Sequence, residues 1–243
     1  MRGYFTIDVF TEPPYNFARN RADINNLDMK IMRSSRKKVS VLAIGAHPDD
    51  IEYGCAATLS RFAEQGNDVY LHILTDGRMG GIPRTRKKEQ ENSAAIMGIK
   101  EVFWADYEDT KLPFYDTVIS TIQKTVDKVK PVFVFIHDGN DTHQDHRYVC
   151  DCTISATRFI PNVLFYEGPS TVHFDPNIYV NIYDRLDLKF RCLRAHRSQV
   201  KRTNIYNQSI LDLAKATAIF RGEYCHQKYA EAYKSLRMMF LLP

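Results

Sequence analysis

The sequence lacks any run of about 20 consecutive apolar residues, so no membrane-spanning helix is predicted. Its N-terminus carries acidic residues and lacks the basic stretch and apolar run of a signal peptide. Cysteine is scarce: there are 5, an odd number, and no two of them form a Cys-x-x-Cys pair. These absences predict a soluble, cytoplasmic protein with reduced thiols, and they exclude a disulfide-rich scaffold.

A strong excess of one charge is also lacking. The formal net charge is only +4. The two basic clusters, Arg33–Lys38 and Arg84–Lys88, have no interleaved aromatic residues of the kind that line a groove for single-stranded nucleic acid. We therefore expect no nucleic-acid partner. The sequence leaves homo-oligomerisation open.

The composition is that of an average globular protein. Hydrophobic residues make up 44% of the chain and charged residues 26%, which is enough to build a core. An α/β chain of this length often forms one domain. Residues 1–36, which contain Pro13-Pro14 and no sustained periodicity, are predicted to be an N-terminal extension. Residues 37–243 are predicted to form a single domain.

Apolar runs and amphipathic segments alternate from Lys38 onward. A short apolar run is typical of a strand that is buried on both faces of a parallel sheet. The predicted strands are 39–46, 69–75, 101–105, 132–137 and 163–166, and the predicted helices are about 50–65, 84–97, 115–130 and 146–159. The part from about Arg185 is expected to be mostly helical. The alternation predicts an α/β fold, a Rossmann-like three-layer sandwich with a mostly parallel central sheet.

Polar clusters follow two of the predicted strands at the point where each strand ends. His47-Pro48-Asp49-Asp50 follows the first strand, and Asp141–His146 follows the strand 132–137. In open parallel sheets, ligands bind outside the carboxyl ends of the strands. The two clusters are therefore expected to face each other across one crevice.

Histidine and aspartate at these positions are suitable ligands for a catalytic zinc, which keeps three protein ligands and one position for water. His47, Asp50 and His146 would supply the three, with one metal per chain, and another divalent metal such as Fe²⁺ would suit the same set. Such a metal lowers the pKa of its water toward ~7, so that a neighbouring carboxylate can complete the deprotonation. Asp49 is the candidate for that general base.

Amide hydrolysis also requires help at the leaving nitrogen and at the developing oxyanion. His143 would provide this help as a second imidazole that does not bind the metal, oriented by Asp145 or Asp141. Each cluster also has a simpler interpretation, because an Asp near a helix start can cap the helix and a His-x-x-His pair can be a capped loop. Their joint presence at two strand ends favours the metal site.

These residues resemble the LmbE-like or PIG-L-like N-acetylglucosaminyl deacetylases over most of the chain after Lys38. Ala46-His47-Pro48-Asp49-Asp50 resembles the family's Ala-His-Pro-Asp-Asp motif, with Ile51 where Glu is often found and Glu52 one place later. His143-Gln144-Asp145-His146 resembles its His-x-Asp-His motif. The other similar positions are Thr75-Asp76-Gly77 with Gly80-Gly81, Arg86-x-x-Glu89 before Met97-Gly98, Arg158, Tyr166-Glu167, His196-x-Ser198-Gln199, and Arg221-Gly222 with Tyr229-Ala230-Glu231-Ala232.

The resemblance implies the same roles that the chemistry suggests. It implies that the zinc ligands are His47, Asp50 and His146, and that the general base is Asp49. It also implies that His143, tuned by Asp145, assists the tetrahedral intermediate and the leaving group. Some relatives have a tyrosine that stabilises the oxyanion where this chain has Asp141, so no such donor is assigned. Arg86 and Arg158 are the candidate substrate-binding residues.

The sequence therefore predicts a zinc-dependent hydrolase that removes the N-acetyl group from an N-acetylglucosamine-type amino sugar, a small-molecule substrate, and releases acetate. The rest of the substrate is not predicted. A dinucleotide-dependent oxidoreductase is strongly disfavoured because no Gly-x-Gly-x-x-Gly follows the first strand. A non-catalytic sugar-binding protein is disfavoured by the presence of Asp49, and a phosphoesterase by the single carboxylate ligand.

Overall fold

The computed structural model describes residues 38–203 and 205–239, so the predicted N-terminal extension, residues 1–36, lies outside the described residues. The strands are β1 (Ser40–Gly45), β2 (Asp68–Thr75), β3 (Glu101–Tyr107), β4 (Phe133–His137), β5 (Asn162–Tyr166), β6 (Ile178–Asn181) and β7 (Ala230–Arg237). The helices are α2 (Asp50–Glu64), α3 (Pro83–Met97), α4 (Tyr115–Val129), α5 (Gln144–Ala156), α6 (Leu186–Ala195) and α7 (Ile210–Tyr224), with a short 3-10 helix η1 (Arg78–Gly80). Across these two ranges, no helix has the length and apolar character needed to cross a membrane.

The strands form one sheet in the order β3-β2-β1-β4-β5-β7-β6. The pairs among β3, β2, β1, β4 and β5 are parallel, whereas β7 pairs antiparallel with both β5 and β6. The predicted α/β fold with a mostly parallel sheet is confirmed. In this order β1 is central: β2 lies beside it on one side, and β4 lies beside it on the other. The carboxyl ends of β1 and β4 therefore lie side by side at a topological switch point, where ligands bind in this class of fold.

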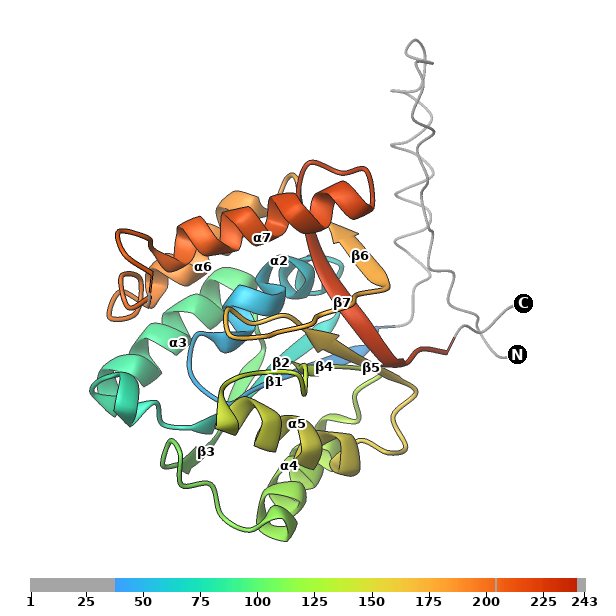
Figure 1. Ribbon diagram of the computed structural model, residues 1–243. Coiled ribbons are helices and arrows are strands. Elements are labelled where there is room, and N and C mark those ends of the chain that lie inside the picture. Colours follow the sequence, from blue (N-terminus) through green and yellow to red (C-terminus); the bar gives the residue numbers. More distant parts are fainter. Residues whose placement is uncertain (1–37, 204, 240–243) are drawn as a thin grey trace. The chain divides into compact units, whose positions relative to one another are not determined.

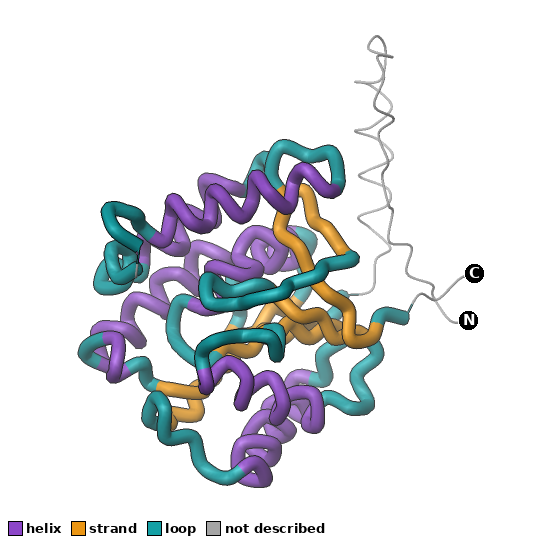
Figure 2. Tube along the Cα trace, viewed as in Figure 1, coloured by secondary structure: helices purple, strands orange, loops and turns teal. Residues whose placement is uncertain are grey.

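Helices cover both faces of the sheet, as Figures 1 and 2 show: α2, α3, α6 and α7 lie on one face, and α4 and α5 lie on the other. Alternate side chains of β1 pack into the two layers. Val41 and Ala43 join the core beneath α2 and α3, whereas Leu42 and Ile44 join the core beneath α4 and α5. Because β1 is buried on both faces, its sequence is a continuous apolar run, which explains why the pattern predicted it.

The C-terminal part differs from the expectation of mostly helical structure. The helices α6 and α7 are present, but β6 and β7 were not predicted, and they extend the sheet in the antiparallel direction. The sequence Ala230–Arg237 has no sustained apolar alternation, because it places Glu231 at a buried position and Lys234 near the surface. Buried Glu231 is stable there because other parts of the chain donate hydrogen bonds to it, and a local pattern does not reveal such partners.

Helix α2 is kinked where Cys55 leaves helical geometry, at φ −148° and ψ 15°. The helical segment after the kink starts with backbone N–H groups that need acceptors. Glu231 of β7 supplies two: its Oε1 accepts the N–H of Ala57 (3.1 Å), and its Oε2 accepts the N–H of Thr58 (2.8 Å) as well as the Thr58 hydroxyl (2.7 Å). Lys189 donates to Glu231 Oε1 (2.7 Å) and to the carbonyl oxygen of Tyr53, just before the kink. A buried ion pair therefore holds the two halves of α2 at a fixed angle.

The first half of α2 packs unusually close to the sheet. A Cβ atom at Gly54 would lie only 2.3 Å from Cδ2 of Tyr166, so glycine is required for this approach. Tyr166 is fully buried, and its hydroxyl donates to the carbonyl oxygen of Ile44 (2.9 Å). This contact places the first turn of α2 directly above the carboxyl ends of the central strands.

Candidate metal centre

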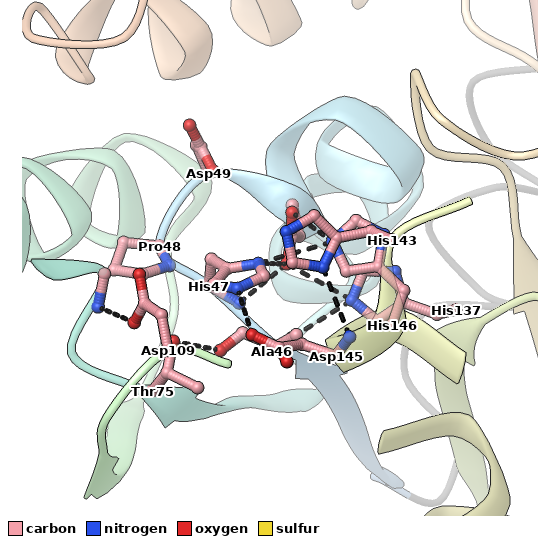
Figure 3. Close-up of polar contacts among 12 residues, drawn as sticks. Ala46, His47, Pro48, Asp49, Thr75, Asp109, His137, His143, Asp145 and His146 are labelled. Atoms are coloured by element: carbon pink, nitrogen blue, oxygen red, sulfur yellow. Dashed lines mark hydrogen bonds and ion pairs between the residues drawn. The ribbon is translucent and has the colours of Figure 1, made fainter. Parts of the chain in front are cut away.

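Three predicted ligands converge at the switch point. His47 follows β1, Asp50 begins α2, and His146 lies in the first turn of α5. His47 Nδ1 lies 3.3 Å from Asp50 Oδ2 and 3.3 Å from His146 Nε2, and His146 Nε2 lies 3.4 Å from Asp50 Oδ1 (Figure 3). The backbone N–H of His47 also donates to Asp50 Oδ2 (2.7 Å), which fixes the carboxylate. The two segments therefore meet as the sequence predicts.

The separations among these atoms fit a zinc-sized ion. Zinc binds nitrogen and oxygen ligands at about 2.0–2.1 Å in tetrahedral geometry, which places any two ligands about 3.3–3.4 Å apart. The two imidazole nitrogens lie 3.3 Å apart, and they lie 3.3 Å and 3.4 Å from different oxygens of Asp50, Oδ2 for His47 and Oδ1 for His146. The set is also chemically suitable, with two imidazoles and one carboxylate.

A buried carboxylate holds the outer nitrogen of each of these imidazoles. Asp145 Oδ2 lies 3.0 Å from His47 Nε2, and Asp141 Oδ2 lies 3.1 Å from His146 Nδ1. Metal-binding histidines usually donate their second N–H to such a carboxylate, which fixes the tautomer. With the proton on the outer nitrogen, the inner nitrogens of His47 and His146 present lone pairs to each other and to Asp50. Such an arrangement is favourable when a proton or a metal cation lies between the acceptors.

The electrostatics of the group agree with this interpretation. Burial disfavours a charged imidazole, yet the carboxylates outweigh it: Asp50 and the bond to Asp145 raise the pKa of His47 to about 10, and Asp50 and Asp141 raise that of His146 to about 9. The carboxylates therefore create an excess of negative charge at the site. That excess attracts a divalent cation as well as protons.

His137 also belongs to the group, although the sequence analysis did not select it. It ends β4, is almost fully buried and stacks on His146 with ring centroids 4.0 Å apart. Its Nε2 lies 3.2 Å from Asp50 Oδ2 and accepts the backbone N–H of Ala46 (3.0 Å). Because that lone pair is used by Ala46, we assign His137 to holding the end of β1. The only signal in the sequence was a polar residue at the end of an apolar strand.

His143 caps helix α5. Its Nδ1 accepts the backbone N–H of Asp145 (3.2 Å), so its own proton lies on Nε2 when the ring is neutral. Burial, together with His47 and His146, lowers its pKa. The capped-loop interpretation therefore describes this residue, which also lies beside His47 with ring centroids 4.7 Å apart.

The expected contact between the Asp145 carboxylate and the ring of His143 is not formed. Asp145 Oδ2 is engaged by His47 and by the N–H of Thr110 (2.9 Å), because the first turn of α5 directs the side chain toward β1. Asp141 orients His143 instead, by accepting its backbone N–H (2.8 Å). The side chains of the two aspartates thus contact the candidate metal ligands, and both residues contact His143 only through backbone N–H groups.

Asp49 stands apart from the imidazoles. Figure 3 shows its side chain pointing away from them, and at 28% exposure it is the most accessible carboxylate of the motif. It precedes α2 but makes no side-chain capping bond, so the helix-cap interpretation does not describe it. Its backbone is in the left-handed region, at φ 99°, which is uncommon for a residue other than glycine. Burial raises its pKa to about 6, although Arg86 opposes the shift.

Arg86, expected to bind substrate, is instead almost fully buried beneath the motif. Its guanidinium donates to the carbonyl oxygens of Gly77 (3.1 Å) and Pro48 and lies 3.1 Å from Asp49 Oδ1. A Cβ atom at Gly80 would lie 2.2 Å from Nη1, so the glycine loop packs directly on it. Arg86 therefore holds Asp49 and the glycine loop in place.

Asp109 is another residue that the sequence analysis did not select. It is buried in the loop after β3, and its carboxylate accepts the N–H groups of Gly77 (2.8 Å) and Met79 (3.1 Å). The glycine loop is therefore fixed from two sides. An aspartate in a polar turn gives no local signal of such a role.

Arg158 is not brought to the site. It follows the C-terminal end of α5, is exposed, packs on Phe159 and donates to the carbonyl oxygen of Ser155. Helix α5 has 13 residues, so its ends lie about 20 Å apart at 1.5 Å per residue. His146 is at the other end.

A cleft of about 700 Å³ lies beside this group rather than at it, between α3 and the edge of the sheet. Most of its charged residues pair with one another: Arg78 with Asp76 (2.7 Å), Lys87 with Asp106, and Lys88 with Glu91 (3.4 Å). None of the candidate ligands lines this cleft. The chemistry lies at the ends of β1 and β4.

Comparisons with known proteins place the chain among deacetylases. Residues 42–157 match the family model PIG-L, described as GlcNAc-PI de-N-acetylase. The chain is 34% identical to the uncharacterized deacetylase YaiS of Escherichia coli, over 71% of this chain and 98% of that protein. It is 28% identical to the diacetylchitobiose deacetylase of Thermococcus kodakarensis, over 90% of this chain and 91% of that one.

A solved structure is similar over almost the whole chain. The N,N'-diacetylchitobiose deacetylase of Pyrococcus horikoshii, determined with an inhibitor, superimposes with a TM-score of 0.74 at 25% identity. The match covers 91% of this chain and 95% of that one. The residues that match the family model, 42–157, include both segments that carry the candidate ligands.

Proposed function

The chain belongs to the PIG-L family of LmbE-like deacetylases, and on this premise we propose that it is a zinc-dependent hydrolase that removes the N-acetyl group from an N-acetylglucosamine-type amino sugar or its conjugate. The observation that carries the proposal is the convergence of His47, Asp50 and His146, whose facing nitrogen and oxygen atoms lie 3.3–3.4 Å apart, with a further carboxylate behind each imidazole. The names of the deacetylases among its relatives support the amide as the bond that is cleaved.

His47, Asp50 and His146 would hold the metal. When bound, it supplies Lewis acidity, which acidifies water and polarises a carbonyl oxygen. Asp145 and Asp141 keep the outer nitrogens of the imidazoles protonated, so that the inner nitrogens stay available as ligands.

Asp49 serves as the general base. It is the motif carboxylate that is both accessible and outside the ligand triangle. It takes a proton from the water that attacks the amide carbon, and Arg86, 3.1 Å from its Oδ1, fixes its direction.

His143 serves at the other end of the reaction. With Nδ1 occupied by the backbone of Asp145, its Nε2–H is directed outward as a donor. It stabilises the oxygen of the tetrahedral intermediate and helps to deliver a proton to the leaving nitrogen. The C–N bond breaks, the water oxygen stays on the acyl carbon as acetate, and the amine leaves with the proton.

The test is to measure bound metal and acetate release from a panel of N-acetylglucosaminides, N,N'-diacetylchitobiose included. We expect about one zinc per chain and acetate release by the wild type. Asp49→Asn is the informative variant, because asparagine tolerates a positive φ: it should keep the metal and lose activity. His143→Ala should also keep the metal.

Three results would contradict the proposal: a wild type without divalent metal, an Asp49→Asn variant with full activity, or saturable sugar binding without acetate release. The last would identify a sugar-binding protein on the same fold.

A further inference from the structure

A second group of buried polar side chains lies behind Asp49, and the proposed reaction does not use it. Glu52 of α2, Gln90 of α3 and His196 at the end of α6 are 0%, 0% and 1% exposed. Burying polar groups is costly unless they bind one another. The group therefore needs either a structural or a functional explanation.

Gln90 connects this group to the backbone of Asp49. The N–H of Asp49 donates to Gln90 Oε1 (3.1 Å), and Gln90 Nε2 donates to Glu52 Oε1 (2.6 Å). A carboxylate only accepts hydrogen bonds, so Glu52 determines which end of the amide faces Asp49. If that orientation were lost, the amide would present a donor to the Asp49 N–H.

His196 lies on the other side of Glu52. Its Nε2 is 3.5 Å from Glu52 Oε1, at the distance of an ion pair. Burial lowers the pKa of an imidazole, but Glu52 outweighs this effect and the pKa of His196 is raised. The ring of His196 therefore lies directly behind the oxygen of Glu52 that accepts the hydrogen bond from Gln90.

The chain anchors His196 firmly. It caps the C-terminal end of α6, and two residues later both the N–H and the hydroxyl of Ser198 donate to Glu89 of α3 (2.8 and 2.6 Å). Gln199 donates to the carbonyl oxygen of Gly80 (3.0 Å). The motif His196-x-Ser198-Gln199 thus fastens α6 to the helix that carries Gln90 and Arg86.

We propose that His196 is a positioning residue for the catalytic base: through Glu52 and Gln90 it holds the peptide of Asp49 in the left-handed conformation that directs the carboxylate onto Arg86. This inference rests on the proposed role of Asp49. A residue other than glycine at φ 99° persists only when its surroundings over-determine it. In this structure, the contacts that hold Asp49 in this conformation come from Arg86 and Gln90.

The first test compares His196→Leu with the matched control His72→Leu in the metal-loaded enzyme. His72 is also a buried histidine, 1% exposed, but it lies in β2 and packs against Phe103 on the opposite face of the sheet. We expect kcat to fall about ten- to a hundredfold in His196→Leu, with KM within about twofold and the metal retained. His72→Leu should lower only the melting temperature.

A double-mutant cycle then separates positioning from general damage. If His196 acts through Asp49, His196→Leu should cause no further loss of kcat once Asp49 is already asparagine. Additive losses would contradict the proposal. Gln90→Leu should repeat the whole pattern, and it replaces His196→Leu if that variant does not fold.

Hydrogen exchange provides a readout that needs no substrate. In 15N-labelled protein, the amide of Asp49 should exchange about tenfold faster in His196→Leu, as expected for the loss of one hydrogen bond, and at the wild-type rate in His72→Leu. Unchanged exchange in both variants overturns the inference. A wild type that releases no acetate, with the exchange pattern as expected, overturns the proposed function and leaves the positioning intact.

Discussion

Two groups of charged side chains are buried to a similar degree, and they differ in how their atoms are paired. At the kink of α2, Lys189 and Glu231 are 3% and 4% exposed; at the metal centre, His47 and His146 are 7% and 4% exposed. In the first group every contact joins a donor to an acceptor, with Lys189, Thr58 and Tyr233 all donating to Glu231. The group is complete without any further atom.

The metal centre has the opposite arrangement. When their rings are neutral, His47 and His146 direct an acceptor nitrogen toward each other and toward the Asp50 carboxylate, because the ring N–H groups are bound to Asp145 and Asp141. Burial and charge alone therefore do not identify a reactive site in this molecule. Convergence of like atoms does, and each of the following experiments tests that distinction.

The largest effect should come from removing a member of the metal centre. We expect His146→Ala, or removal of the metal by a chelator, to lower activity by about 10³-fold or more, since a catalytic metal contributes several kcal/mol. The far-ultraviolet circular dichroism should stay that of a folded protein. Collapse of the fold in the chelated wild type would mean that this group is structural, like the one at the kink.

The kink group should show the reverse behaviour. Lys189→Met leaves the Glu231 carboxylate buried without its cation, so the free energy of unfolding should fall by about 3–5 kcal/mol, measured by urea denaturation. The fraction that remains folded should bind metal normally. The double variant Lys189→Met/Glu231→Leu should recover much of the stability, because no unpaired charge remains. Loss of metal binding in either variant would contradict the distinction between a structural group at the kink and a metal-binding group at the strand ends.

The outer carboxylates should have an intermediate effect. Asp145→Asn no longer fixes the tautomer of His47, and we expect the metal to bind about 10–100-fold more weakly, as measured by competition with a chelating dye. Asp141→Asn should weaken metal binding to a similar extent, because Asp141 fixes the tautomer of His146. If neither variant changes the affinity, the carboxylates serve only to hold the backbone of Thr110 and His143.

The smallest effect is expected at Arg158. The side chain is exposed at the distant end of α5, so Arg158→Ala should change kcat/KM by less than about twofold and stability by less than about 0.5 kcal/mol. Steady-state kinetics and thermal melting measure both. A tenfold rise in KM would show that the substrate extends to that end of the helix.

The sequence predicted the parts of the fold that are encoded locally. Strands such as β1 are apolar throughout because they are buried on both faces, and the helices between them carry clear stop signals such as Gly98. β7 was not predicted because its buried Glu231 is stabilised by α2 and α6, far away in sequence. An edge strand that is stabilised by partners far away in sequence, as β7 is, cannot be predicted from its local pattern.

The site shows the same division. The candidate ligands lie in two short motifs at strand ends, so their convergence followed from topology. The pairing of Asp145 with His47, the burial of Arg86 and the role of His137 depend on contacts between side chains of different elements. Spacing along the chain carries no information about such contacts.

The close packing at Gly54 makes the position of Asp50 depend on a residue that is not a candidate ligand. Asp50 lies in the first turn of α2. That turn can approach Tyr166 closely only because Gly54 has no Cβ atom. His47 and His146 are held by different elements, so they would not follow if α2 were lifted. A larger residue at position 54 would therefore move Asp50 relative to both imidazoles, although position 54 is not itself a candidate ligand.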